Sequence, residues 1–242
     1  RAMDHGFNTY TRFDGLAELR QALAKKLARY NGIQADPETD ITVSAGATGS
    51  FHCTCAALLN PGDEVILFEP YYQYHATALK SVDVVPVSVR MQPPDWTFSL
   101  ADVERAVTDR TRAIVVNSPG NPSGKVFSQV ELESIAGVLQ GTDVIVLTDE
   151  VYEYMCFDGR RHISPGTVTG LRDRTLTIGG FSKTFSITGW RIGYVAGPPA
   201  TVDAIGRVFD QINVSAPRPL QRGVERALRE LPASFYSDLP AT

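Results

Sequence analysis

A lysine and an arginine lie close together in a segment whose residue types suit covalent chemistry. Lys183 follows the apolar run 175–178 and two glycines, and Arg191 follows Thr188-Gly189-Trp190. A strand that ends at Lys183 would bring the amine into a partly dry site, where burial disfavours the charged form and lowers the pKa. The neutral amine can then form a Schiff base with an aldehyde. The alternative is that Lys183 only caps the strand, which is the better interpretation of an isolated lysine.

Three further polar segments each follow an apolar run. They are 45–50, 117–124 and 149–152. Each segment lies where a strand is expected to end, and open α/β sheets bind ligands at the carboxyl ends of their strands. We therefore expect the four segments to meet in one site.

Together these segments resemble the fold-type I, pyridoxal-phosphate-dependent aminotransferases of class I and II. The similarity extends to the branch that includes kynurenine aminotransferases and glutamine transaminase K. It runs from about Asn8 to about Pro219 and is most specific in 183–191, Asn121-Pro122 and Asp149. The resemblance implies pyridoxal 5'-phosphate as cofactor. It also implies transfer of an amino group from an L-amino acid (aromatic, kynurenine, glutamine or methionine type) to a 2-oxo acid.

The resemblance gives catalytic and ring-binding roles to five residues. Lys183 would hold the cofactor and then move a proton as general base and acid. Asp149 would pair with the ring nitrogen and raise its pKa. Tyr152 and Asn121 would hydrogen-bond the phenolic oxygen of the ring, and Tyr72 would stack on it. The alternatives are a helix cap for Asp149, ordinary turn chemistry for Asn121 and Tyr152, and a core or surface tyrosine for Tyr72.

The resemblance also implies a phosphate site. Ala47 and Thr48 lie at the start of a predicted helix, where free N–H groups and the helix dipole attract an anion. Arg191 can bind two phosphate oxygens at once, and Ser182 would add a hydroxyl. Many relatives have a serine three residues before the lysine, where this chain has Gly180. We therefore expect the phosphate site to lack one hydrogen bond or to use a water instead.

Partners and alternative functions follow from the same resemblance. Tyr10 matches a tyrosine that reaches the phosphate of the neighbouring subunit, which implies a homodimer. A β-eliminating C–S lyase of the same fold is an alternative, because the same carbanion expels a β-leaving group. A non-catalytic ligand-sensing domain of the same fold is a second alternative.

The order of the elements predicts an α/β fold. Short runs rich in valine and isoleucine are typical of strands that are buried on both faces. The predicted strands are Ile41–Ser44, Glu64–Phe68, Val82–Val87, Arg112–Asn117, Asp143–Thr148, Thr175–Gly179 and Arg191–Ala196. The predicted helices include Gly15–Tyr30, Gly49–Leu59, Ser128–Leu139 and Leu220–Leu231. Too few residues separate the last two strands for a crossover helix, so we expect the last strand to run antiparallel to its neighbour.

These elements predict the three-layer α/β/α large domain of fold-type I enzymes, with a seven-stranded, mostly parallel sheet. Residues 1–30 form an N-terminal segment and first helix, 31–216 the cofactor-binding large domain, and 217–242 the start of an interdomain helix. The resemblance implies that the small domain, with the arginine that binds the substrate carboxylate, lies largely outside this sequence.

Composition excludes several classes of protein. A chain of 242 residues with 43% apolar content can bury a large core. Its net charge of −4 and lack of a basic block do not favour nucleic acid or an anionic membrane surface. No apolar run approaches the roughly 18 residues of a membrane span.

Cysteine and histidine usage adds two expectations. The three cysteines, Cys53, Cys55 and Cys156, predict buried reduced thiols and a cytoplasmic protein. The four histidines, His5, His52, His75 and His162, show no metal-ligand spacing, so no metal is expected.

Overall fold

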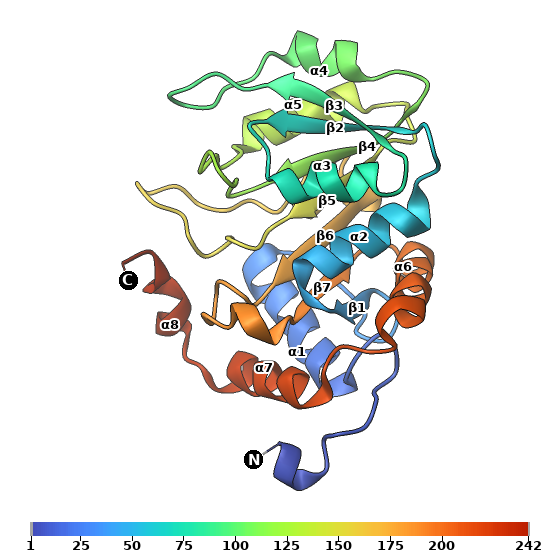
Figure 1. Cartoon of the computed structure of the whole chain (residues 1–242). Helices are drawn as coiled ribbons and strands as arrows, with labels where there is room; N and C mark the ends of the chain where they lie inside the picture. Colours follow the sequence, from blue (N-terminus) through green and yellow to red (C-terminus); the bar gives the residue numbers. More distant parts are fainter. Residues whose placement is uncertain (1, 242) are drawn as a thin grey trace.

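The computed structural model describes residues 2–241 and contains one seven-stranded sheet with helices on both faces (Figure 1). The strands are β1 (Ile41–Ser44), β2 (Glu64–Glu69), β3 (Val85–Arg90), β4 (Thr111–Asn117), β5 (Ile145–Asp149), β6 (Thr175–Gly180) and β7 (Gly193–Ala196). Their order in the sheet is β1-β7-β6-β5-β4-β2-β3. β7 runs antiparallel to β1 and β6, whereas the other neighbours are parallel. The predicted fold class is therefore confirmed.

The helices divide between the two faces of the sheet. They are α1 (Ala17–Lys26), α2 (Gly46–Leu58), α3 (Gln73–Lys80), α4 (Leu100–Ala106), α5 (Gln129–Val138), α6 (Pro199–Asn213), α7 (Arg218–Glu230) and α8 (Ala233–Ser237). Alternate residues of a strand point to opposite faces. On β2, Val65 and Leu67 therefore join the core under α2, α3 and α6, whereas Ile66 and Phe68 join the core under α4 and α5.

Several predicted boundaries are wrong by three residues or more. The helix α2 starts at Gly46 rather than Gly49, and β3 spans Val85–Arg90 rather than Val82–Val87. Asp83 has a φ of 58°, which belongs to a turn and delays the strand. The helix α1 ends at Lys26 rather than Tyr30, and a π-helical turn, Leu27–Asn31, follows it. The helices α3, α4, α6 and α8 were not predicted. A capping box starts α5, where Ser128 accepts a hydrogen bond from the Glu131 backbone and Glu131 accepts one from the Ser128 backbone.

The cysteine side chains are partly as expected. Cys53 and Cys55 are buried and Cys156 is half-buried, and all three thiols are free. Burial raises the pKa of Cys53 to about 11 and that of Cys55 to about 12. Among the residues that the structure describes, no helix is long and apolar enough to span a membrane.

The first turn of α2 packs directly onto the sheet. Gly193 of β7 pairs in register with Gly180 of β6 and with Ser44 of β1. A Cβ atom at Gly193 would overlap the backbone of Gly46 and Ala47. Gly46 has a φ of 78°, a left-handed conformation that favours glycine. These glycines therefore allow the start of α2 to lie against β7.

This contact predicts an effect on stability. Gly193→Ala should lower the free energy of unfolding by about 1–3 kcal/mol, because the new methyl group overlaps backbone atoms that cannot rotate away. Gly137→Ala in α5 is the control, since nothing lies within 4 Å of an added Cβ there. That control should stabilise the helix by up to about 1 kcal/mol. Urea unfolding measures the stability of both variants. An unchanged free energy of unfolding for Gly193→Ala would contradict the close contact.

Candidate active site

A cavity of about 210 Å³ lies where the parallel strands end. Its lining includes every residue of the predicted site except Tyr10: Ala47, Thr48, Tyr72, Asn121, Asp149, Tyr152, Ser182, Lys183 and Arg191. The fold thus brings together the four predicted segments and the segment that carries Tyr72, all far apart in the sequence. Tyr10 lies in the N-terminal segment, and 76% of it is exposed.

One end of the cavity is positively charged. The helix α2 begins there, and its N-cap residue Ala45 makes no side-chain hydrogen bond to the first turn. The N–H groups of a first turn have no partner within the helix. Arg191 lies against Gly46, and its Nη1 donates a hydrogen bond to Thr188 O at 3.0 Å and lies 3.5 Å from Ser182 Oγ. Among residues 2–241, no carboxylate forms an ion pair with Arg191. This end therefore suits a phosphate group.

A carboxylate lies elsewhere in the cavity lining. Asp149 is the last residue of β5 and is 9% exposed. Its Oδ2 accepts a hydrogen bond from His75 Nε2 at 2.9 Å, and its Oδ1 accepts one from Val151 N at 3.3 Å. His75 itself is 3% exposed and packs between the rings of Phe51 and Tyr72. The hydrogen bond from His75 fixes Oδ2 of Asp149 in place. The carboxylate can therefore face a cationic ring nitrogen in a constant orientation.

Sequence reasoning missed His75 and Asn117. His75 and Asp149 are 74 positions apart in the sequence, so no local pattern could indicate their contact. Asn117 Oδ1 accepts a hydrogen bond from Asn121 N at 2.8 Å, and its Nδ2 donates to Asp149 O at 3.0 Å. Asn117 therefore ties the segment that carries Asn121 to the end of β5. Its place at the end of an apolar strand was the available indication.

Lys183 lies beside the aromatic residues of the cavity. It is half-buried, and its Nζ lies 5.7 Å from the centre of the Tyr152 ring. The Tyr72 ring stacks on Tyr74, with ring centres 5.0 Å apart. Burial, with the nearby Tyr74 and Asp149, raises the pKa of Tyr72, so its hydroxyl stays protonated. A primary amine, aromatic walls, an anion site and a carboxylate together fit a phosphorylated aromatic aldehyde.

The fold and the cavity fit the class of pyridoxal-phosphate-dependent enzymes with a mostly parallel sheet, and comparison with known proteins gives the family. Residues 1–235 match the family "Aminotransferase class I and II". The chain therefore belongs to this family, whose members use pyridoxal phosphate.

Curated relatives and solved structures agree with this assignment. The aromatic-amino-acid aminotransferase 2 of Thermococcus litoralis is 36% identical over 95% of this chain and 59% of its own length. The kynurenine–oxoglutarate transaminase of Dictyostelium discoideum is 36% identical over 93% of this chain and 56% of its own length. A solved methionine aminotransferase of Escherichia coli superimposes with a TM-score of 0.95 at 33% identity, covering 99% of this chain and 63% of that one. The chain thus spans less than two thirds of these relatives.

Gly180 allows a direct test of the phosphate end. An added Cβ there would meet Ala47 Cβ at 3.4 Å and Ala47 N at 3.5 Å, which are ordinary contact distances. Gly180→Ser should therefore fit and add a hydroxyl beside the first turn of α2. We expect the dissociation constant of pyridoxal phosphate to fall about fivefold, the effect of one added hydrogen bond. Absorbance titration measures it, with Gly180→Ala as the control that adds only the methyl group. Equal affinities for the two variants would contradict a phosphate at this position.

Proposed function

We propose that the protein carrying this chain is a pyridoxal-phosphate-dependent aminotransferase that transfers an amino group from an L-amino acid to a 2-oxo acid. The observation that supports this most is the convergence of Lys183, Arg191 and Asp149 on one cavity. The printed names of the relatives include aromatic amino acids, kynurenine and methionine. They support a substrate of aromatic, kynurenine or methionine type, and the sequence resemblance adds glutamine.

The positions of the side chains support the catalytic roles that the resemblance implies. When bound, pyridoxal phosphate supplies an aldehyde that takes up amines and a protonated ring that accepts electrons from the substrate α-carbon. Lys183 Nζ would hold the aldehyde carbon and, once displaced by the incoming amine, carry the proton from the substrate Cα to the neighbouring cofactor carbon. Asp149 would hold the ring N–H, with its carboxylate oriented by His75.

The other cavity residues would bind and orient the cofactor. The N–H groups of Ala47 and Thr48, with the guanidinium of Arg191, would bind the phosphate. Asn121 and Tyr152 would hydrogen-bond the ring oxygen. Tyr72 and Ser182 complete the proposed set, as a stacking surface and as a further phosphate donor.

We also propose that the protein is a cytoplasmic homodimer in which Tyr10 binds the phosphate in the neighbouring subunit. Tyr10 is exposed and lies outside the cavity of its own chain, which supports a contact with another chain. The neighbouring Thr9 accepts a hydrogen bond from Arg218 of α7, so part of this segment is attached to the domain. The three free thiols support a reducing compartment.

Chemical reduction tests the role of Lys183. The chain incubated with pyridoxal phosphate should be yellow, and borohydride should abolish the visible band and leave the label on the peptide that contains Lys183. Lys183→Ala should keep some cofactor through Arg191 and the first turn of α2 but lose amino-group transfer. A label on Lys80 or Lys125 would contradict the assignment. A separate assay distinguishes the two reactions. Transfer of the amino group to an added 2-oxo acid indicates transamination, whereas release of pyruvate indicates β-elimination.

Sedimentation equilibrium tests the dimer. We expect the chain to sediment as a dimer, and we expect Tyr10→Phe to remain dimeric while its affinity for pyridoxal phosphate falls about tenfold. The physical reason is that this change removes one hydroxyl that donates to a charged phosphate. Ser134→Ala serves as a control, because that hydroxyl bonds within its own helix to Val130 O and lies outside the cavity lining. A monomeric chain would contradict the two-chain site. So would a dimeric Tyr10→Phe variant with unchanged affinity for pyridoxal phosphate.

A further inference from the structure

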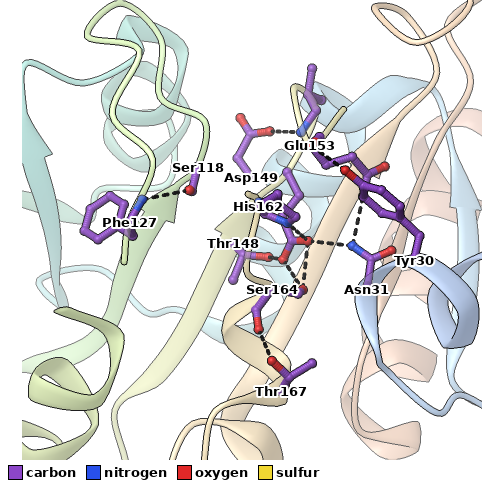
Figure 2. A network of polar contacts seen from close by, with 12 residues as sticks. Tyr30, Asn31, Ser118, Phe127, Thr148, Asp149, Glu153, His162, Ser164 and Thr167 are labelled. Carbon is purple, nitrogen blue, oxygen red and sulfur yellow. Dashed lines mark hydrogen bonds and ion pairs between the residues drawn. The ribbon is translucent and has the colours of Figure 1, made fainter. Parts of the chain in front are cut away.

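A buried charged network lies behind the end of β5, on the side that faces α1. Successive residues at a strand end point to opposite faces, so Asp149 faces the cavity while Glu150 points away from it. Glu150 is fully buried. Its carboxylate accepts hydrogen bonds from His162 Nε2 at 2.7 Å, from Ser164 Oγ at 2.7 Å and from two further groups. Those two are Thr148 Oγ1 at 2.8 Å and Asn31 Nδ2 at 3.0 Å (Figure 2).

A second carboxylate extends the network. Glu153 pairs with Lys26 Nζ at 2.5 Å and accepts a hydrogen bond from Asn31 Nδ2 at 2.8 Å. Lys26 lies at the end of α1 and is almost fully buried. Its ammonium lies 5.5–5.8 Å from the ring centres of three tyrosines and 3.0 Å from one of their hydroxyl groups. These tyrosines are Tyr30, Tyr154 and Tyr194.

The network holds the turn that follows Asp149. Glu150 and Glu153 point into the network, whereas Val151 and Tyr152, which lie between them, line the cavity. The backbone of this turn is further fixed by bonds from Glu150 N to Ile178 O and from Glu153 N to Glu150 O. Burial alone would raise the pKa of Glu150, but His162 and the hydroxyl donors hold it below its usual value. The carboxylate is therefore ionised and keeps its four donors.

Metal binding is the other function that this cluster could have. Ligand atoms of Glu150, Glu153 and His162 lie within 4.8 Å of one another. However, the ammonium of Lys26 already contacts Glu153, and Asn31 Nδ2 lies between the two carboxylates. A cation is thus already present as part of the chain, so the contacts favour a network that is complete without a metal.

We propose that Lys26, Glu153, Glu150 and His162 form a positioning network that fixes the orientation of Asp149 and Tyr152 toward the cofactor. This inference rests on the proposed function. None of the four residues lines the cavity, so each acts through the turn 149–153. Buried ion pairs are often replaceable by apolar residues without loss of stability, whereas misplacement of catalytic groups is costly. A fixed geometry, rather than stability, is therefore what the network contributes.

The test separates positioning from stability. Lys26→Met leaves the Glu153 carboxylate without its cation, and Lys26→Met/Glu153→Met replaces both by an apolar pair. The control is Arg20→Met, which removes another buried cation of α1 that pairs with Asp14 and Glu38 rather than with the network. Each variant is measured by urea unfolding, by absorbance titration with pyridoxal phosphate, and by hydrogen–deuterium exchange of 149–154 in the cofactor-free chain.

We expect the double variant to regain most of the stability lost in Lys26→Met. Its affinity for the cofactor should stay at least about tenfold weaker than that of the original chain, since an anchoring charged hydrogen bond is gone. Exchange in 149–154 should stay faster in the double variant. Arg20→Met should lose stability but keep both the affinity and the slow exchange. If Lys26→Met does not fold, the affinity and exchange of the double variant are still compared with those of Arg20→Met and of the original chain.

Two results would overturn the proposal. One is recovery of affinity and slow exchange together with stability in the double variant, which would make the network structural only. The other is one equivalent of Zn²⁺ or Mn²⁺ bound by the original chain and lost in Glu153→Gln, which would make it a metal site. Failure of the original chain to bind the cofactor through Lys183 would instead count against the proposed function, and exchange in the cofactor-free chain would still decide the positioning.

Discussion

The contact between the first turn of α2 and β7 is the constraint on which the rest of the site depends. Because β7 runs antiparallel to β6, it starts at the edge where β6 ends, and Gly180 and Gly193 lie side by side in register. The missing side chain at Gly193 leaves room for the backbone of α2, whereas an added Cβ at Gly180 would meet Ala47 only at an ordinary contact distance. The positive end of that helix thus lies in one cavity with Lys183 and Arg191. A larger side chain at Gly193 would displace the anion site as a whole.

Charge separation then orients whatever the cavity binds. The guanidinium of Arg191 and the N–H groups of α2 attract an anion at one end, whereas Asp149, bonded to His75, attracts a cation. A ligand that carries both charges can bind in one orientation only. Its central atoms would then lie near Lys183. The start of α2 and the buried contact between Asp149 and His75 are fixed parts of the fold, and the exposed Arg191 is held by its hydrogen bond to Thr188 O. This arrangement favours a preorganised site.

Local patterns in the sequence predicted those parts that depend on neighbouring residues. Apolar runs followed by polar turns located the strand ends, whereas the individual residues that line the cavity came from the resemblance to the family. Contacts between distant segments could not be predicted in this way. His75 meets Asp149 across 74 residues, and Lys26 meets Glu153 across 127. The helix α3 was missed because its sequence, Gln73–Lys80, mixes aromatic and polar residues without a clear apolar stripe. The edge strand β3 has few buried residues, which explains its misplaced boundary.

The end of β5 shows how one short segment serves both faces of the sheet. Asp149 meets the cavity with a carboxylate that retains some solvent exposure, whereas Glu150 is fully buried among four donors. The same type of group therefore has two environments one residue apart. A change on the α1 side must reach the cavity through the backbone between Glu150 and Glu153, because no side chain of the network enters it. A rigid turn transmits such a change as a displacement of Asp149 and Tyr152, and a small displacement of reacting groups has a large effect on rate.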